Sequence, residues 1–335
     1  MQRWELDKLG RENLHLREAE IPRPAPGEVL IRVGAVSLNY RDKMVIEHGQ
    51  GLPLQFPFTP GCDLAGRVVE TNGVGRFAPG DSVTSMITDW LDGQRPGDAR
   101  QLWYRTLGGY HPGVLAEYVV VPDSWLVRAP ASLSEVETST LPCAGLTAWF
   151  ALFERGGLRA GQSVLIEGTG GVALFGLQIA LSLGAVPVVS TSVAKMELVR
   201  KMGAQHVVDR LQSDWVEAVL LAVGDRGVDH VLELVGGSHL GRAAAVAAVG
   251  GRVSIIGALE GFELSTPLMP VLFKDLILQG IAAGHRRALE ELVAFVDKVH
   301  LKPVINGRYA LTDLQAALDH LERGPFGKVV IELGL

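Results

Sequence analysis

The stretch Val164-Leu-Ile-Glu-Gly-Thr-Gly-Gly-Val-Ala-Leu-Phe-Gly-Leu-Gln-Ile-Ala180 combines a buried strand, a glycine turn and a helix. The apolar run from Val164 to Ile166 predicts the strand, and an apolar helix is expected from about Val172 to Leu183. In the turn, Gly168 permits a sharp bend and Gly170 lets the main chain approach a ligand closely. The first N–H groups of the helix have no partners within it and lie at the positive end of its dipole. A diphosphate is therefore a suitable ligand for this turn.

The residues after the helix continue the pattern of a dinucleotide-binding fold. Gly184 and Ala185 end the helix, and Val186-Pro-Val-Val189 predicts a second, parallel strand. A glycine triplet alone would also suit a turn that binds nothing, but the order of strand, turn, helix and strand favours a dinucleotide. The residues expected to line the site are Gly168, Thr169, Gly170, Gly171 and Val172 at the turn, and Val235, Gly236 and Gly257 at the ends of later strands.

The end of the second strand favours NADP(H) over NAD(H). In NAD-binding folds, an acidic residue about 20 positions after the first glycine binds the ribose hydroxyls. Here Ser190-Thr191-Ser192 occupy that place, Lys195 follows, and no carboxylate appears before Glu197. Hydroxyls and a lysine suit a 2′-phosphate, for which Arg210 offers a second positive charge. The alternative for Lys195 and Arg210 is a solvated helix face and loop.

Length and composition set the class of protein. The chain has 335 residues, which is enough for two domains with cores of their own. Hydrophobic residues make up 47% and charged residues 20%, as in globular proteins. The net charge of −6 gives no general attraction to nucleic acid or to an anionic membrane. The charged N-terminus and the two cysteines predict a protein of the reducing cytoplasm, without signal peptide or membrane span.

Two kinds of pattern divide the chain. Through about Arg128 the sequence predicts strands and turns, including a strand at 28–36 that leads into the polar cluster Ser37-Leu-Asn-Tyr-Arg-Asp-Lys43. From about Gly161 to Gly257, strand and helix patterns alternate. The expected fold class is α/β, with a β-rich domain and a doubly wound parallel-sheet domain.

Short motifs along nearly the whole chain point to a known family. They are Leu38-Asn-Tyr-Arg-Asp42, Pro60-Gly-Cys-Asp63, Pro79-Gly-Asp81, Ala116-Glu-Tyr-Val119, Leu141-Pro-Cys-Ala-Gly-Leu-Thr-Ala-Trp149, the glycine turn, Gly227-Val-Asp-His-Val231 and Gly327-Lys-Val-Val330. Through them the sequence resembles the medium-chain dehydrogenases/reductases, in their zinc-independent, quinone-oxidoreductase-like branch.

The resemblance implies a fold and an assembly. A GroES-like catalytic domain would span residues 1–128 and be completed by 286–335, and a Rossmann NADP-binding domain would span 129–285. The substrate would sit in the cleft between the two domains. A homodimer joined edge to edge through the Rossmann sheets is also implied. The candidate edge strand runs from Glu263 to Leu268 and is interrupted by Pro267.

Zinc-dependent members of that family hold a catalytic zinc at three positions that are occupied here by Asn39, Cys62 and Cys143. A neutral asparagine is a poor ligand, because a catalytic zinc needs three nitrogen, sulfur or carboxylate donors. The segment 90–113 contains no cysteine, so the family's four-cysteine structural zinc cluster is not expected. A weak metal site at Cys62, Cys143 and Asp63 is an alternative. The prediction is two partly buried thiols and no metal.

Without a Lewis acid, hydrogen-bond donors must stabilise the negative charge that grows on a substrate oxygen during hydride transfer. Tyr40 is the first candidate for that donor or acid, with Asn39 and Arg41 as assistants, and a packed aromatic side chain is the alternative for Tyr40. The resemblance adds residues near the cofactor, which are Asn39, Thr147, Phe326, Gly327 and Lys328.

The expected function is a zinc-independent oxidoreductase that transfers a hydride between NADPH and a small quinone, enone or aldehyde. Two alternatives remain open: a reversible, zinc-free alcohol dehydrogenase, and an NADPH-binding sensor without turnover, since a fold and a cofactor site do not by themselves establish catalysis.

Overall fold

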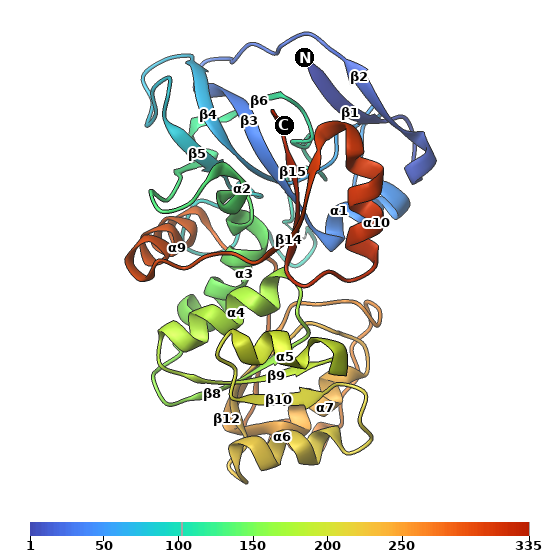
Figure 1. The fold of residues 1–335 in the computed structure, drawn as a ribbon, viewed down its shortest axis with the longest axis vertical. Helices are drawn as coiled ribbons and strands as arrows, with labels where there is room; N and C mark the ends of the chain where they lie inside the picture. The colour runs from blue at the N-terminus through green and yellow to red at the C-terminus, as the bar shows by residue number, and fades with distance from the viewer. Residues whose placement is uncertain (102, 335) are drawn as a thin grey trace. The chain divides into compact units, whose positions relative to one another are not determined.

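The computed structural model describes residues 1–101 and 103–334, and the chain divides into two compact units (Figure 1). Unit 1 contains Met1–Leu146 and Ala283–Leu335, and unit 2 contains Thr147–Ala282. Unit 1 therefore extends beyond Arg128, because the short helix α2 (Glu135–Thr138) packs on strands β3 and β4 of this unit.

Unit 1 is built on a seven-stranded sheet in which β6 pairs with β3 beside the main strand order β14-β15-β3-β4-β5-β7. Strand β3 (Glu28–Leu38) is antiparallel to β15, β4 and β6, and most of its apolar side chains are buried in the core. In Figure 1 the C-terminal strand β15 lies beside β3, although the two are far apart in the sequence.

The remaining strands of unit 1 belong to this sheet, except β1 and β2, which form a separate two-stranded sheet. The strands of unit 1 other than β3 are β1 (Gln2–Leu6), β2 (Leu14–Glu18), β4 (Asp63–Thr71), β5 (Ser82–Ser85), β6 (Tyr118–Pro122), β7 (Leu126–Arg128), β14 (Ile305–Ala310) and β15 (Lys328–Glu332). Its other α-helices are α1 (Tyr40–His48), α9 (Arg286–Val299) and α10 (Leu314–Glu322). A π-helical turn at Leu141–Gly145 ends this unit's N-terminal part and carries Cys143.

Unit 2 contains a six-stranded parallel sheet in the order β10-β9-β8-β11-β12-β13. The strands are β8 (Ser163–Glu167), β9 (Val186–Thr191), β10 (His206–Asp209), β11 (Val228–Glu233), β12 (Ala247–Ile255) and β13 (Ile277–Gly280). The helices are α3 (Leu146–Trp149), which begins at the last residue of unit 1, α4 (Gly171–Ser182), α5 (Val193–Lys201), α6 (Trp215–Val223), α7 (His239–Val246) and α8 (Leu268–Phe273). The strand order changes direction between β8 and β11, and ligands of doubly wound folds bind at the carboxyl ends of the strands there.

The predicted fold class is confirmed, and α4 and β9 lie within one or two residues of the expected ranges. The expected strand from Glu263 to Leu268 is wrong. Pro267 precedes helix α8, and the edge of the sheet is β13, further along the chain. Proline suits the start of a helix but removes a donor that a strand needs.

The alanine-rich stretch from Leu240 to Val249 favours one continuous helix by its composition, but helix α7 ends at Val246. The chain leaves the helix after Val246, and Ala247 begins β12 with an extended backbone. Alanine favours a helix by propensity, but pairing of Val228 with Ala247 decides the local structure. Within the described part of the chain, no helix combines the length and the apolar character needed to cross a membrane.

Candidate active site

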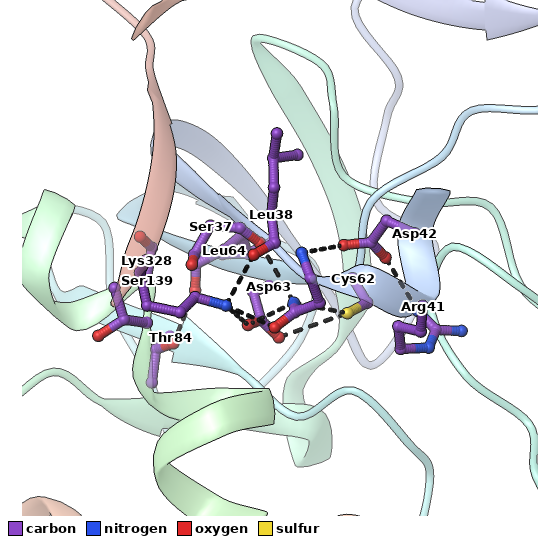
Figure 2. Close-up of polar contacts among 12 residues, drawn as sticks. Ser37, Leu38, Arg41, Asp42, Cys62, Asp63, Leu64, Thr84, Ser139 and Lys328 are labelled. Carbon is purple, nitrogen blue, oxygen red and sulfur yellow. Dashed lines mark hydrogen bonds and ion pairs between the residues drawn. The ribbon is translucent and has the colours of Figure 1, made fainter. Parts of the chain in front are cut away.

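Three neighbouring strands of unit 1 bring Asn39, Asp63 and Lys328 together. Asn39 follows the last residue of β3, Asp63 begins β4, and Lys328 begins β15. In the sheet register, Ser37 pairs with Asp63 and Leu38 pairs with Val329, so the three side chains come from adjacent ends of the strands. Figure 2 shows Lys328 and Cys62 on opposite sides of Asp63 in this view.

The ammonium group of Lys328 is buried, with only 4% of the residue exposed. Its Nζ donates hydrogen bonds to the carbonyl oxygen of Leu38 at 2.8 Å and to Oδ1 of Asn39. It also lies 4.0 Å from Oδ2 of Asp63. Because Oδ1 of Asn39 accepts from the lysine, its Nδ2 faces Asp63 and donates to Oδ2 at 2.9 Å. Lys328 thereby fixes the orientation of the Asn39 amide.

Asp63 is fully buried, and burial raises the pKa of its carboxyl group from 3.8 to about 6. The charge of Lys328 and the hydrogen bond from Asn39 act in the opposite direction, so the carboxyl group ionises above about pH 6. Near neutral pH, the three residues form a buried, hydrogen-bonded array in which Asp63 is largely a carboxylate.

Both thiols of the chain lie beside this array. Cys62 Sγ is 3.5 Å from Nδ2 of Asn39 and 3.4 Å from Oδ1 of Asp63. Burial raises the pKa of the Cys62 thiol well above its ordinary value, and a hydrogen bond with Cys143 and the nearby carboxylates raises it further. Cys62 is therefore a neutral thiol at physiological pH and not a nucleophile.

Arg41 supplies a fixed positive charge next to the thiols. Its guanidinium donates to Oδ1 of Asp42 at 3.1 Å and to Oγ1 of Thr106 at 2.8 Å. Burial lowers the pKa of Arg41, but the neighbouring Cys62, Tyr104, Asp42 and Cys143 together raise it well above the ordinary value. Burial raises the pKa of the Tyr104 phenol, whereas the charge of Arg41 opposes that rise. A phenol and a guanidinium thus lie together in unit 1.

The three predicted catalytic residues differ in burial and in hydrogen-bond partners. Asn39 is buried and its backbone N–H donates to Asp42 at 2.9 Å, while Arg41 is held by Asp42 and Thr106. Tyr40 begins α1 and is 45% exposed. Sequence reasoning included Asp63 only in the alternative, weak metal site and gave Tyr104 no catalytic role. Their only signals were an acidic residue in the Pro60-Gly-Cys-Asp63 motif and an aromatic residue in a polar loop.

The predicted cofactor residues fall into both units. Phe326, Gly327 and Lys328 lie with Asn39 in unit 1, and the others lie in unit 2. Gly327 has a φ of +97°, and a Cβ there would lie 2.3 Å from the carbonyl oxygen of Val304. The packing of the main chain alone therefore explains this glycine. Thr147 is buried within α3, whose preceding turn begins at Leu141.

The glycine turn of unit 2 has the geometry of a phosphate-binding site. Gly168 has a φ of +84°, and its N–H donates to the carbonyl oxygen of Ser190 at 2.7 Å. Gly170 caps α4 without a side-chain hydrogen bond, and a Cβ placed there would meet no atom within 4 Å. Thr169 is buried, whereas Gly171 and Val172 form the partly exposed first turn of α4. The N–H groups of this turn and the open space beside Gly170 fit a diphosphate.

At the end of β9, the structure brings Lys195 and Arg210 together. The N–H of Arg210 donates to the carbonyl oxygen of Thr191 at 2.9 Å. Burial and the positive charge of Arg210 lower the pKa of Lys195. Ser192 caps α5, but the hydroxyl of Ser190 already accepts a hydrogen bond from the indole of Trp215 at 2.7 Å.

The ends of β11 and β12 approach each other closely. A Cβ on Gly257 would lie 1.8 Å from the carbonyl oxygen of Leu234, so only glycine fits. The N–H groups of Val235 and Gly236 donate to Oε1 of Glu233 at 2.9 Å and 2.7 Å. Glu233 therefore holds the turn that carries two of the predicted cofactor residues.

Two family models match this chain, one mainly in unit 1 and one mainly in unit 2. The family model described as alcohol dehydrogenase GroES-like domain matches residues 25–131, and that described as zinc-binding dehydrogenase matches residues 171–298. A zinc-type alcohol dehydrogenase-like protein of Schizosaccharomyces pombe is 36% identical over 337 residues, which cover 97% of this chain and 96% of that protein. The quinone oxidoreductase of Rattus norvegicus is 27% identical over 338 residues, covering 97% and 95%.

Among solved structures, one described as an alcohol dehydrogenase of Sinorhizobium meliloti 1021 has a TM-score of 0.96 and 54% identity, covering 99% of this chain and 98% of its own. Similarity of this extent over both units identifies the family and, with it, binding of a nicotinamide cofactor. The chain therefore belongs to the medium-chain dehydrogenase/reductase superfamily and is an oxidoreductase.

Proposed function

We propose that this oxidoreductase transfers a hydride between NADP(H) and a small quinone, enone or aldehyde, without a catalytic zinc. The observation that carries the proposal is the buried ammonium of Lys328, which is fixed between Asn39 and Asp63 where zinc-dependent relatives place a metal ligand. A nicotinamide, when bound, donates or accepts the hydride. The side chains of this protein must stabilise charge on the substrate and supply the proton.

The charges of unit 1 fit a zinc ion poorly. The ligand atoms of Cys62, Asp63 and Cys143 lie within 4.8 Å of one another, which is close enough for a metal site. However, Asp63 already faces the ammonium of Lys328, and the positive charge of Arg41 acts on both thiols. Asn39 also presents an N–H group, not a lone pair, to Cys62 and Asp63. A dication placed here would be repelled by two fixed cations and would meet a donor in place of a ligand.

The same charges suit stabilisation of a substrate oxygen. Arg41 is held rigidly by Asp42 and Thr106, so its charge needs little reorganisation when negative charge develops nearby. Tyr104, whose phenol lies in the field of Arg41, is the group in unit 1 best placed to act as proton donor. Tyr40, which is exposed at the start of α1, is a second candidate for that proton. Asn39 and Lys328 hold the carboxyl group of Asp63 in place beside Cys62.

The preference for NADP(H) rests on the pair Lys195 and Arg210. Burial and the nearby charge of Arg210 lower the pKa of Lys195, and two adjacent positive charges are stabilised by a dianion such as the 2′-phosphate. Thr191 is the last residue of β9, and Ser192 next to it caps α5, the helix that carries Lys195. An NAD-binding site would need a carboxylate at this position, and the sequence has none before Glu197.

A homodimer formed through the edge of the unit 2 sheet is also proposed. Strand β13 ends the sheet, and large apolar side chains that are 45% or more exposed gather on and before it. They are Leu259, Phe262, Leu264, Leu268, Met269, Leu272, Phe273 and Ile277. An unpaired strand edge beside exposed apolar side chains fits a second copy of the chain.

Fluorescence titration with NADPH and NADH tests the cofactor proposal. The wild type should prefer NADPH, and Lys195→Ala with Arg210→Ala should remove most of the preference, because each lost charge-assisted hydrogen bond costs about 1 to 3 kcal/mol. Arg200→Ala with Lys201→Ala, which removes two exposed positive charges from the end of α5, should leave the preference intact. Equal binding of NADH and NADPH by the wild type would contradict the proposal.

Turnover separates the substrate classes. A fall in NADPH absorbance is expected with quinones, enones or aldehydes, in protein whose zinc content is below the enzyme concentration. Reduction of NADP⁺ by alcohols alone would instead favour the alcohol dehydrogenase. Tight NADPH binding without turnover of any compound would favour a sensor.

A further inference from the structure

Unit 2 contains a second group of ionisable side chains, formed by Glu167, Glu233 and His239. Glu167 ends β8 and Glu233 ends β11, and these two strands are neighbours in the sheet. Leu232 pairs with Ile166, so the two glutamates follow next in the same register. His239 is the first residue of α7. We refer to these three residues as the carboxylate–histidine cluster.

The cluster is buried but not satisfied by hydrogen bonds. The side chains of Glu167, Glu233 and His239 are 2%, 0% and 9% exposed. Oε2 of Glu167 accepts from the N–H of Leu234 at 3.2 Å, and Oε1 of Glu233 accepts from two backbone N–H groups. Three atoms form no hydrogen bond within the described part of the chain: Oε1 of Glu167, Oε2 of Glu233 and Nδ1 of His239.

The three ligand atoms converge. Nδ1 of His239 lies 3.2 Å from Oε1 of Glu167 and 3.9 Å from Oε1 of Glu233. One ligand atom from each residue lies within 4.8 Å of those of the other two. Atoms bound to one transition-metal ion at about 2.0 to 2.2 Å lie about 3 to 4 Å apart, so this separation needs little adjustment.

The charges around the carboxylate–histidine cluster also favour binding of a cation. Within residues 1–101 and 103–334, neither glutamate forms an ion pair with a lysine or arginine. Arg242 is the basic side chain whose charge acts on His239, and its guanidinium lies over the Trp215 ring at 4.6 Å. Trp215 in turn meets His239 edge to face at 5.3 Å. Buried carboxylates are normally paired with a cation or bound to a metal.

We propose that Glu167, Glu233 and His239 bind one divalent transition-metal ion. Two carboxylate oxygens and one imidazole nitrogen are ligands typical of Zn²⁺ and of Mn²⁺ or Fe²⁺, whereas Ca²⁺ and Mg²⁺ prefer oxygen alone. This site is distinct from the positions of the zinc-dependent relatives, since all three ligands belong to unit 2.

A metal ion here would have a role in cofactor binding. Glu167 directly precedes Gly168 of the glycine turn, and Glu233 holds the N–H groups of Val235 and Gly236. Negative charge on the carboxylates at these strand ends would oppose an anionic dinucleotide, and a divalent cation neutralises it. The ion would also fix both turns through the carboxylates that anchor them.

The test measures metal binding by the full chain, independently of activity. Protein freed of metal with a chelator is incubated with Zn²⁺, desalted and analysed for zinc, and its melting temperature is recorded with and without the ion. The Cys62→Ala, Cys143→Ala variant serves as the background, so that the thiols contribute no ligand. This variant should bind one zinc per chain and melt at a higher temperature with zinc.

In that background, each of three single changes should weaken zinc binding by at least about tenfold: Glu233→Gln, Glu167→Gln and His239→Gln. Even residues that only hydrogen-bond to a metal ligand change the affinity by this much. Glu233→Gln keeps an oxygen for the two backbone N–H groups, and the far-ultraviolet circular dichroism of each variant checks its fold. Glu263→Gln, a change of a loop glutamate, is the control.

Co²⁺ provides a spectroscopic measurement in the wild type. Binding at the carboxylate–histidine cluster should give cobalt absorption without a thiolate charge-transfer band. Zinc binding that disappears with the two cysteines, or that persists at full strength in the glutamine variants, would overturn the proposal. Failure of the Cys62→Ala, Cys143→Ala variant to bind zinc would overturn the proposal as well.

Discussion

Replacing Asp63 with asparagine tests the electrostatics of the site in unit 1. The pKa of this carboxyl group rises from 3.8 to about 6 because the side chain is buried. A carboxyl group with a raised pKa holds its proton more tightly in the folded state. Its contribution to stability is therefore present below about pH 4, is lost as the pH rises, and is fully lost above about pH 6.

The magnitude follows from the two pKa values. A rise from 3.8 to about 6 corresponds to about 3 kcal/mol of unfolding free energy that wild type loses between acid and neutral pH. Asp63→Asn keeps an oxygen to accept from Nδ2 of Asn39 but cannot ionise. We expect the difference in unfolding free energy between variant and wild type to shift by about 3 kcal/mol in favour of the variant between about pH 4 and about pH 8.

Urea denaturation at a series of pH values measures this difference. Asp81→Asn is a control of opposite sign, because a hydrogen bond from Ala78 and the charge of Arg128 lower the pKa of Asp81. Its carboxylate contributes stability that is present above the ordinary pKa and is lost as the pH falls. If Asp63→Asn leaves the pH dependence of wild type unchanged, Asp63 is not the buried, proton-binding group described here.

Three further predictions follow from the structure. Lys328→Met should lower the unfolding free energy by about 3 to 5 kcal/mol in urea titrations, because it leaves Asp63 as an uncompensated buried charge; full stability would refute the array. Gly170→Ala should lower the melting temperature of the free protein only slightly, since a Cβ there meets no atom within 4 Å, but should strongly weaken NADPH binding in fluorescence titrations; unaltered affinity would place the diphosphate elsewhere. Leu272→Glu with Phe273→Glu should convert a dimer to a monomer in light scattering, and an unchanged mass would exclude this surface as the interface.

The fold was predictable wherever a local pattern matched the tertiary structure. The strand, glycine turn and helix around Gly168 follow from the sequence because each element shows its own periodicity and its own boundary residues. The structure of the region from Glu263 to Leu268 could not be predicted in this way, because Pro267 is compatible with both an edge strand and a helix start. Only the pairing of β12 with β13 decides which segment forms the edge.

The candidate site was predictable in part. Asn39 and Arg41 stand in a polar cluster after a strand, which is a local signal. The contact between Asn39 and Lys328 spans 289 positions, and it depends on the register of β15 against β3. Likewise, Glu167 and Glu233 each look like ordinary strand ends. Their proximity follows only from the crossover that makes β8 and β11 neighbours.

The insertion of β15 between β14 and β3 has a consequence for biosynthesis. Residues Ala35 to Leu38 of β3 emerge from the ribosome before all of unit 2, whereas their partners in β15 emerge after it. Until then, the edge of β3 is exposed and can pair with another chain. Unit 2 is one continuous stretch of the chain and can fold before the second segment of unit 1 has been made. The ammonium of Lys328 is made with β15, so the polar array can be completed only after the whole of unit 2 has been synthesised.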